Sequence, residues 1–167
     1  MALKKADAAR MVEACHQANV LLTIGFVRRF DTFWGKFKHI IQSGAVGRPV
    51  VWRFAAGGKP PHPWFRDRNK GGGPLIDAAI HNYDFALQMF GPVASVQSSS
   101  LQLDRTSVGA DTATAILNFE SGDQHALIWS WGVAAGTPVT SLNDFIGSKG
   151  TLQFGMTAQS APPSFNP

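Results

Sequence analysis

The sequence predicts an α+β fold in which an open, mainly antiparallel sheet carries helices on one face. Segments with the apolar spacing of helices dominate the first half of the chain, and short strand-like segments separated by turn residues follow from Val93 onward. Helices grouped apart from a run of strands, rather than alternating with them, are typical of this class. With 167 residues, of which 44% are hydrophobic, the chain can bury one sizeable core.

The first thirty residues do not fit that sheet. A short helix is expected over residues 6–18, with Asp7 near its positive end. Residues 20–27 are almost continuously apolar, which predicts a strand buried on both faces, as in a parallel sheet covered by helices. Such a strand needs neighbours that the rest of the sequence does not supply. We therefore expect residues 1–30 to be the remnant of a second domain and residues 31–157 to form the main one.

Two helices are expected in the main domain. Asp31 is placed to cap the first, and Gly44 is placed to end it. Pro74 is placed as the first residue of the second, which should run to Phe90 and stop at Gly91. Four polar residues of this second helix are spaced by four, three and four positions and should project in one stripe. They are Asp77, His81, Asp84 and Gln88.

Strands are expected at residues 49–56, 93–103, 111–119, 124–133, 142–147 and 151–154, joined by hairpins into a meandering sheet. The strand from Gln124 is apolar on both faces, so helices should cover one face and another subunit the other. Exposed Trp129 and Trp131 would then mediate self-association through the sheet, giving a homo-oligomer. The polar loop at 57–73 is long enough to be functional. The Pro- and Ser-rich residues 158–167 are expected to form a flexible tail.

Composition narrows the function classes. The net charge is +4, but its Lys and Arg residues are scattered, so we expect no nucleic-acid partner. The concentration of basic residues at 59–70 fits a cleft for a phosphorylated or acidic ligand better. No apolar run approaches the roughly 20 residues of a membrane span. The single cysteine, Cys15, excludes an internal disulfide and indicates a reducing compartment, so a cytoplasmic location is expected.

The segment most suggestive of chemistry is Gly71-Gly72-Gly73 followed by Asp77 and His81. Glycines permit close backbone approach to a ligand, and a histidine near its neutral midpoint can take a proton from a hydroxyl as hydride leaves the carbon. Asp77 and His81 can instead belong to the solvated face of an amphipathic helix. A third reading is a metal-dependent lyase or isomerase using Asp77, His81 and Asp84, with His62 or His125 completing a metal shell. The absence of Cys pairs and of a His-x-x-x-His motif argues against a metal.

Four segments in this order and spacing resemble the Gfo/Idh/MocA oxidoreductase family. They are GFVRRFD at 25–31, SGAVGRP at 43–49, WFRD at 64–67, and GGGPLIDAAIH at 71–81 together with Asp84. The resemblance implies a Rossmann domain joined to a larger α+β domain with an open sheet. It also implies hydride transfer between NAD or NADP and a sugar, polyol or related hydroxyl compound.

The resemblance also implies roles for individual residues. His81 matches the proton-transferring histidine of the family and Asp77 its partner carboxylate. Trp64, Arg66, Asp67 and Asp84 match positions around the substrate pocket. Arg28 or Arg29 lies on the strand that leads to the nicotinamide end of the cleft, and Arg28 is the candidate cofactor-binding residue.

The sequence departs from the family at its beginning. Family members start with a glycine-rich strand-turn-helix that binds the dinucleotide, and later carry a Glu-Lys-Pro whose Lys completes the catalytic group. Neither motif occurs in these 167 residues. We therefore expect the last helix and strand of a Rossmann domain plus most of a substrate domain, inactive alone. The alternative is a non-catalytic sugar-binding or oligomerisation module.

Overall fold

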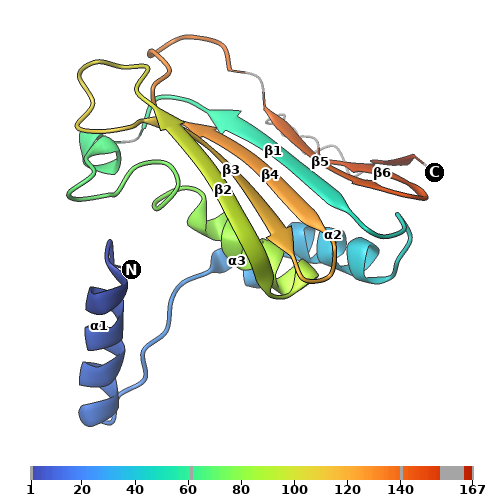
Figure 1. The fold of residues 1–167 in the computed structure, drawn as a ribbon, viewed down its shortest axis with the longest axis horizontal. Helices are drawn as coiled ribbons and strands as arrows, with labels where there is room; N and C mark the ends of the chain where they lie inside the picture. Colours follow the sequence, from blue (N-terminus) through green and yellow to red (C-terminus); the bar gives the residue numbers. More distant parts are fainter. Residues whose placement is uncertain (1, 61, 140, 155–163, 167) are drawn as a thin grey trace.

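The computed structural model describes residues 2–60, 62–139, 141–154 and 164–166 (Figure 1). Its helices are α1 (Lys5–Gln17), η1 (Val27–Arg29), α2 (Thr32–Gln42), η2 (Pro63–Arg66) and α3 (Ile80–Phe90). Its strands are β1 (Val51–Gly57), β2 (Val93–Leu101), β3 (Thr112–Phe119), β4 (Gln124–Ser130), β5 (Leu142–Gly147), β6 (Gly150–Gln153) and β7 (Ser164–Asn166). The expected α+β class is confirmed, and the six predicted strands lie within three residues of their observed bounds.

The strands form one seven-stranded sheet in the order β2-β3-β4-β1-β5-β6-β7. Every neighbouring pair is antiparallel except β1 and β4, which run parallel. The hairpins predicted at residues 120–123 and 148–150 are present. The sheet is not a simple meander, because β1 comes first along the chain but lies between β4 and β5. This central position makes β1 the strand around which the core is built.

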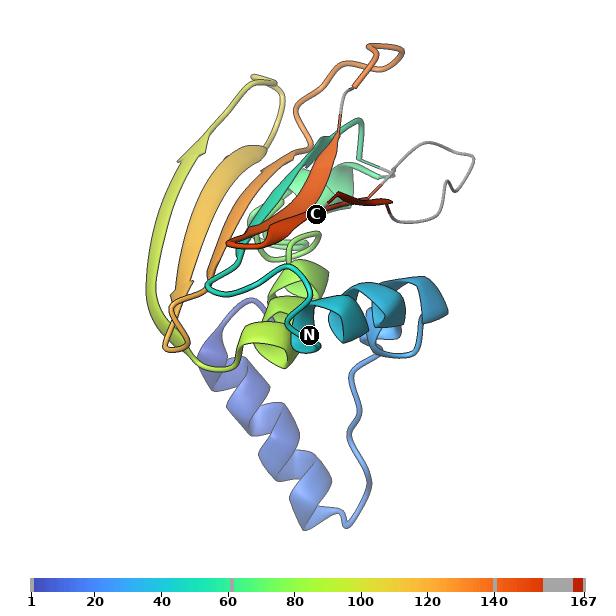
Figure 2. The same ribbon diagram turned by 90° about the vertical axis from the view of Figure 1, so that its right-hand side faces the viewer.

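Helices α2 and α3 cover one face of the sheet (Figure 2). The Asp31 carboxylate accepts hydrogen bonds from the backbone N–H groups of Phe33 and Trp34, at 2.8 and 3.0 Å, as the expected N-cap. Gly44 adopts a φ of +76°, the left-handed conformation expected after a helix end. Between helices and sheet lies an aromatic core in which Trp52 of β1 is fully buried. The remaining large side chains of this core include Phe37, Phe54, Phe85 and Phe145.

The two tryptophans expected on the exposed sheet face lie elsewhere. Strand register places Phe54 beside Leu127 and Ala55 beside Ile128. Trp129 therefore shares the helix-covered face and stacks on Phe54 with ring centroids 5.3 Å apart. Trp131 is also only partly exposed, and its ring lies 5.5 Å from that of Trp129. The prediction was wrong because alternation alone does not tell which face is covered; Ile128, 46% exposed, lies on the open face instead.

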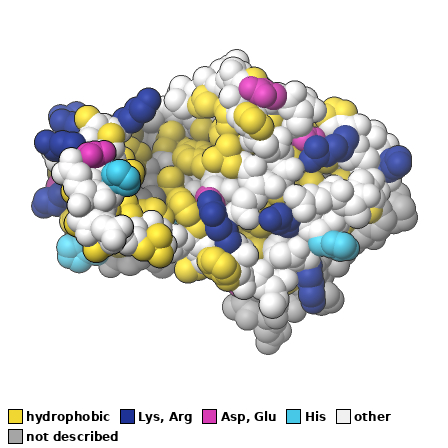
Figure 3. Space-filling model, turned by 90° about the horizontal axis from the view of Figure 1, so that it is seen from below, with side chains coloured by type: hydrophobic (Ala, Val, Ile, Leu, Met, Phe, Trp, Pro, Cys, Tyr) yellow, Lys and Arg dark blue, Asp and Glu magenta, His cyan; other side chains and the backbone are white. Residues whose placement is uncertain are grey.

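The segment preceding the main domain differs from its predicted form. α1 stands away from the sheet, and each of its residues is at least partly exposed (Figure 1). Residues 20–26 form no regular secondary structure and pair with no strand among the described residues, so the predicted buried strand is wrong for this chain. Leu21 is 89% exposed. Apolar side chains gather on the face between α1 and the main body (Figure 3), where a hollow of about 280 Å³ is lined by Met11, Leu22, Ile24 and Ile80, among others.

Helix α3 begins later than the sequence predicts. The Gly73 carbonyl accepts the N–H groups of both Ile76 and Asp77, and the Ala79 N–H donates to the Pro74 carbonyl five residues back. These wide and bifurcated turns break the regular helical ladder, so regular α-helix starts at Ile80 rather than at Pro74. Asp77 is therefore on a turn. The expected polar stripe is also wrong, because Asp84 is buried.

Only three residues of the flexible tail expected at 158–167 are described by the structure. Ser164–Asn166 pair with β6 as strand β7, which the sequence did not predict. Residues 158–163 and 167, the rest of the expected tail, lie outside the described residues. Throughout the described part of the chain, every helix is too short or too polar to cross a membrane.

Candidate functional site

His81 and Asp77 lie half-buried at the entrance to α3. Burial, together with the charge of Arg28, lowers the pKa of His81 below its usual 6.5, against the opposing charges of Asp77 and Asp84. Burial raises the pKa of Asp77, while His81 acts in the opposite direction. The Nδ1 atom of His81 is buried and has no hydrogen-bond partner within the described structure. His81 is therefore a largely neutral imidazole at neutral pH with a free ring nitrogen.

Arg28 reaches the same place from η1. Its Nη1 atom donates a hydrogen bond of 3.0 Å to Oδ1 of Asn82, the residue directly after His81. Its guanidinium carbon lies 4.2 Å from the centre of the Trp34 ring, a cation–π contact. Burial lowers the pKa of Arg28 to about 10, so the side chain still carries its charge at neutral pH. A fixed positive charge is thus placed beside His81.

Asp84, expected around the substrate pocket, is held by the neighbouring arginine. The Arg29 guanidinium donates to both carboxylate oxygens of Asp84, with Nε 2.9 Å from Oδ2. The side-chain amide of Gln88 donates to the same Oδ2 at 3.0 Å. With both oxygens engaged and only 7% of the side chain exposed, Asp84 joins α3 to the η1 segment.

Trp64, Arg66 and Asp67 lie together around a cavity of about 180 Å³. The cavity is lined by two stretches of chain, residues 62–70 around η2 and residues 106–108 of the β2–β3 loop; its lining residues are His62, Pro63, Trp64, Arg66, Asp67, Lys70, Thr106, Ser107 and Val108. Gly71 closes the first stretch against Trp64 and Phe65, where a Cβ atom would come within 2.9 Å of both residues. The first glycine of the triplet is therefore required by the packing of this loop.

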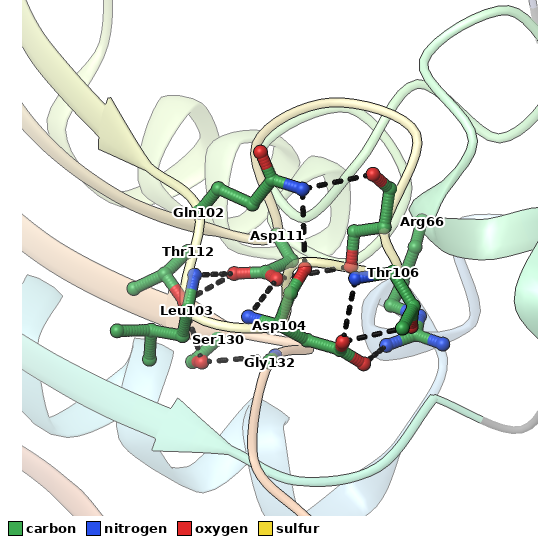
Figure 4. A network of polar contacts seen from close by, with 10 residues as sticks. Arg66, Gln102, Leu103, Asp104, Thr106, Asp111, Thr112, Ser130 and Gly132 are labelled. Carbon is green, nitrogen blue, oxygen red and sulfur yellow. Dashed lines mark hydrogen bonds and ion pairs between the residues drawn. The ribbon is translucent and has the colours of Figure 1, made fainter.

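Ion pairs and hydrogen bonds fix both walls of the cavity (Figure 4). Arg66 forms an ion pair with Asp104, which joins the η2 segment to the β2–β3 loop. The buried carboxylate of Asp111 accepts the backbone N–H groups of Leu103 and Asp104 at 2.9 and 2.8 Å. On the first wall, the Lys70 ammonium lies 3.4 Å from Oδ2 of Asp67.

The structure thus assembles two groups of the expected residues. Asp77, His81 and Arg28 form one, and the residues of the cavity form the other. Asp77 and His81 lie outside the cavity lining. Two backbone hydrogen bonds connect the two groups. The Gly73 N–H donates to the Phe65 carbonyl at 3.2 Å, and the Asp77 N–H donates to the Gly73 carbonyl at 2.9 Å.

Three site residues were missed by the sequence reasoning: Asn82, Asp104 and Asp111. The Asp-x-Thr pattern at 104–106 is a signal that could have indicated an ordered turn, since Asp104 accepts the Thr106 N–H at 2.8 Å. Nothing in the sequence marks Asn82.

In the described ranges, no cluster of three His, Cys, Asp or Glu side chains could hold a metal ion. His125, a residue of β4, is fully buried, with Nδ1 3.2 Å from the Trp52 carbonyl oxygen.

Comparison with known proteins shows which family the chain resembles. Residues 34–153 match the model of the GFO/IDH/MocA C-terminal domain. The chain is 35% identical over 127 residues to myo-inositol 2-dehydrogenase of Thermotoga maritima, covering 73% of this chain and 38% of that protein. It is 30% identical over 129 residues to scyllo-inositol 2-dehydrogenase (NAD(+)) of Bacillus subtilis, covering 73% of this chain and 36% of that protein.

Solved structures agree on the architecture. The WlbA dehydrogenase from Bordetella pertussis, solved in complex with NADH and UDP-GlcNAcA, superposes with a TM-score of 0.82 at 24% identity, over 100% of this chain and 54% of that one. The chain therefore spans well under two thirds of the relatives it matches. Because the family model covers most of its length, this chain belongs to the GFO/IDH/MocA oxidoreductase family and contains that family's C-terminal domain.

Proposed function

We propose that this chain is the substrate side of an NAD- or NADP-dependent oxidoreductase that transfers hydride to or from a sugar, polyol or related hydroxyl compound. The observation that carries the proposal is a half-buried, largely neutral His81 placed next to Asp77 and the charge of Arg28. The inositol dehydrogenase names of the relatives support the same reaction class.

In this proposal His81 is the proton-transfer residue. Oxidation of a secondary alcohol to a ketone breaks one O–H and one C–H bond. The nicotinamide, when bound, supplies the hydride acceptor. His81 accepts the hydroxyl proton, for which a lowered pKa keeps the imidazole unprotonated, and the negative charge of Asp77 then stabilises the imidazolium. Asp84, held by Arg29, fixes α3 and with it the position of His81.

The residues of this chain can contact the nicotinamide end of a dinucleotide but do not include a binding turn for its pyrophosphate. The 167 residues contain no Gly-x-Gly-x-x-Gly turn, the usual cradle for the pyrophosphate. We propose that the cofactor is bound mainly by a dinucleotide-binding domain outside these residues, and that Arg28, fixed by Asn82 and Trp34, faces its nicotinamide end. The exposed apolar residues of 20–27 and the hollow beside α1 support residues 1–30 as the part that packs on that domain.

We also propose that the open face of the sheet mediates self-association. Ile128 of β4 lies on this face with Ala126 and with Ile116 of β3. Apolar side chains on a face that none of the described helices covers favour a second sheet as the partner. The Arg53–Asp144 ion pair on the same face offers complementary charges across a two-fold axis.

One observation favours the second candidate, a sugar-binding module without catalysis. The cavity around Trp64 is complete within this chain, yet Asp77 and His81 do not line it. A module of this kind would bind polyols whether or not a nicotinamide nucleotide were added.

The two candidates are separated by a chimera. The matching segment of the Thermotoga maritima enzyme is replaced by this chain, and NAD-dependent oxidation of myo-inositol is followed at 340 nm. The proposal expects turnover in the chimera and its loss in the His81→Asn form. Polyol binding by the chimera without turnover would favour the binding module.

A further inference from the structure

The cavity around Trp64 carries balanced charge. Three charged side chains line it: Arg66, Asp67 and Lys70. Arg66 is paired with Asp104, which lies behind the lining, and Lys70 is paired with Asp67. Two cations therefore face two carboxylates. Of the four basic residues at 59–70, the two that line the cavity are therefore paired, Arg66 with a residue 38 positions away.

Asp104 is held in place as the partner of Arg66. Its backbone N–H donates to Oδ2 of the buried Asp111 at 2.8 Å (Figure 4). Its Oδ1 accepts the Thr106 N–H at 2.8 Å and the Thr106 hydroxyl at 2.7 Å, which leaves Oδ2 for Arg66. These Thr106 hydrogen bonds, with Arg66, lower the pKa of Asp104 to about 2, so it is ionised at neutral pH. The negative charge is thus held in a fixed place directly behind the cavity lining.

The second ion pair and the backbone complete the enclosure. The Arg68 N–H donates to the Val108 carbonyl at 3.0 Å and ties the two walls together independently of any charge. Trp64, 44% exposed as a residue, contributes to the lining. The hydroxyl-bearing Thr106 and Ser107 line the opposite wall. A flat apolar surface opposite hydroxyls and paired charges matches a ring with hydroxyl groups, one side of which is C–H.

We propose that Asp104 is a specificity-determining residue, which by engaging Arg66 makes this cavity select an uncharged polyhydroxylated ring over a sugar acid or sugar phosphate. An anionic ligand would have to compete with Asp104 for the guanidinium and with Asp67 for the ammonium, and would meet two carboxylates of its own sign. A neutral ring can use the same groups as hydrogen-bond donors and acceptors without breaking either pair. The inference deepens the proposed function, on which it rests for the choice of a sugar or polyol.

The test measures ligand preference in the 167-residue chain itself. Binding of myo-inositol, D-glucuronate and D-glucose 6-phosphate is followed by ligand-observed NMR, with the total tryptophan fluorescence of the chain as a second reading. The wild-type chain is expected to bind myo-inositol at least tenfold more tightly than either anion. Equal or tighter binding of an anion, or binding of none of the three, would overturn the inference.

The decisive variant is Asp104→Asn, which keeps the shape of the side chain and removes its charge. With Arg66 released, affinity for D-glucuronate should rise about tenfold, as expected of a charge-assisted contact. Affinity for myo-inositol should change less than threefold. In the double variant Arg66→Gln with Asp104→Asn the gain should disappear, because the cation that would receive the carboxylate is gone.

The matched control is Asp7→Asn, which removes one negative charge from an exposed ion pair with Arg10 on α1. It should leave all three affinities unchanged, whereas an equal gain in Asp7→Asn would reduce the effect to net charge and refute the role of Asp104. Circular dichroism checks that each variant is folded; if Asp104→Asn unfolds, Arg66→Gln alone must leave the wild-type preference for myo-inositol over D-glucuronate intact. Failure of the proposed function gives a different result. The chimera would then show no turnover, while the preference of the chain for myo-inositol over D-glucuronate would persist.

Discussion

Arg28 donates a hydrogen bond from Nη1 to Oδ1 of Asn82 across 3.0 Å, and so joins η1 to α3 one residue beyond His81. The contact links positions 54 residues apart in the sequence. It places the partly buried cation of Arg28 next to the His81 imidazole, whose pKa that charge lowers. The environment of His81 is therefore set by the segment that leads into the domain as well as by its own helix.

Replacing Arg28 with Gln should raise the pKa of His81. The positive charge of Arg28 disfavours the imidazolium, and its removal leaves Asp77 and Asp84 less opposed. A titration of the His81 ring signals by NMR measures the effect. Arg10→Gln, a change on the exposed face of α1, serves as the control and should leave His81 unchanged. A His81 pKa that stays the same or falls in Arg28→Gln would show that the charge does not act on the ring.

Stability should fall in acid through His125. Burial lowers the folded-state pKa of His125 to about 3, whereas the unfolded chain titrates near 6.5. Because the unfolded state binds the proton first, the contribution of neutral His125 is fully present above pH 6.5. It is lost progressively as pH falls from 6.5 toward 3. The total loss is on the order of a few kcal/mol.

Urea unfolding at several pH values measures this dependence. His125→Phe retains an aromatic ring against Trp52, with which His125 stacks at 3.8 Å, and should flatten the curve between pH 6.5 and 3. His16→Gln on α1 controls for the loss of a histidine and should keep the wild-type slope. A slope that survives in His125→Phe would assign the acid sensitivity to other groups.

Breaking the Arg29–Asp84 pair should destabilise the domain. In Asp84→Asn the buried side chain loses its charge-assisted bonds to Arg29 but keeps a partner in Gln88. We expect a loss of about 1–3 kcal/mol in the free energy of unfolding. The exposed pair of Asp7 and Arg10 provides the comparison, since Asp7→Asn should cost less than about 0.5 kcal/mol. Equal effects of the two substitutions would remove any special role for Asp84.

Placing a charge on the open sheet face should prevent self-association. Ile128→Lys introduces a cation at the centre of β4, where the proposed sheet contact would desolvate it. Sedimentation velocity at micromolar concentration is expected to show an oligomer for the wild type and a monomer for the variant. Val12→Lys, the same kind of change on α1, should remain oligomeric. A monomeric wild-type chain would contradict the proposed interface.

Local signals in the sequence predicted the elements well. The cap of α2 depends on Asp31 and two backbone groups within three residues, and the hairpin at 120–123 depends on its own turn residues. Strand bounds follow from alternation over a few positions. Trp64, Arg66 and Asp67 lie around one cavity because η2 brings these neighbours in sequence into one turn.

Features that depend on distant partners could not be predicted. From the sequence alone Asp84 is expected on the surface. In the structure it is bound by Arg29, which lies 55 positions away in the sequence. The strand-like residues 20–27 have the apolar pattern of a buried strand, but pairing needs a neighbour, which the described chain does not provide. The charge of the cavity likewise depends on Asp104, which is contributed by a different loop from Arg66.

The proton-transfer role of His81 is tested most directly by the turnover number of the chimera carrying this chain. His81→Asn should lower kcat for myo-inositol oxidation about 10²- to 10⁴-fold, the usual contribution of a positioned acid or base. KM should change only a few-fold, because the cavity around Trp64 is intact. A His81→Asn chimera with the kcat of its parent would contradict the account.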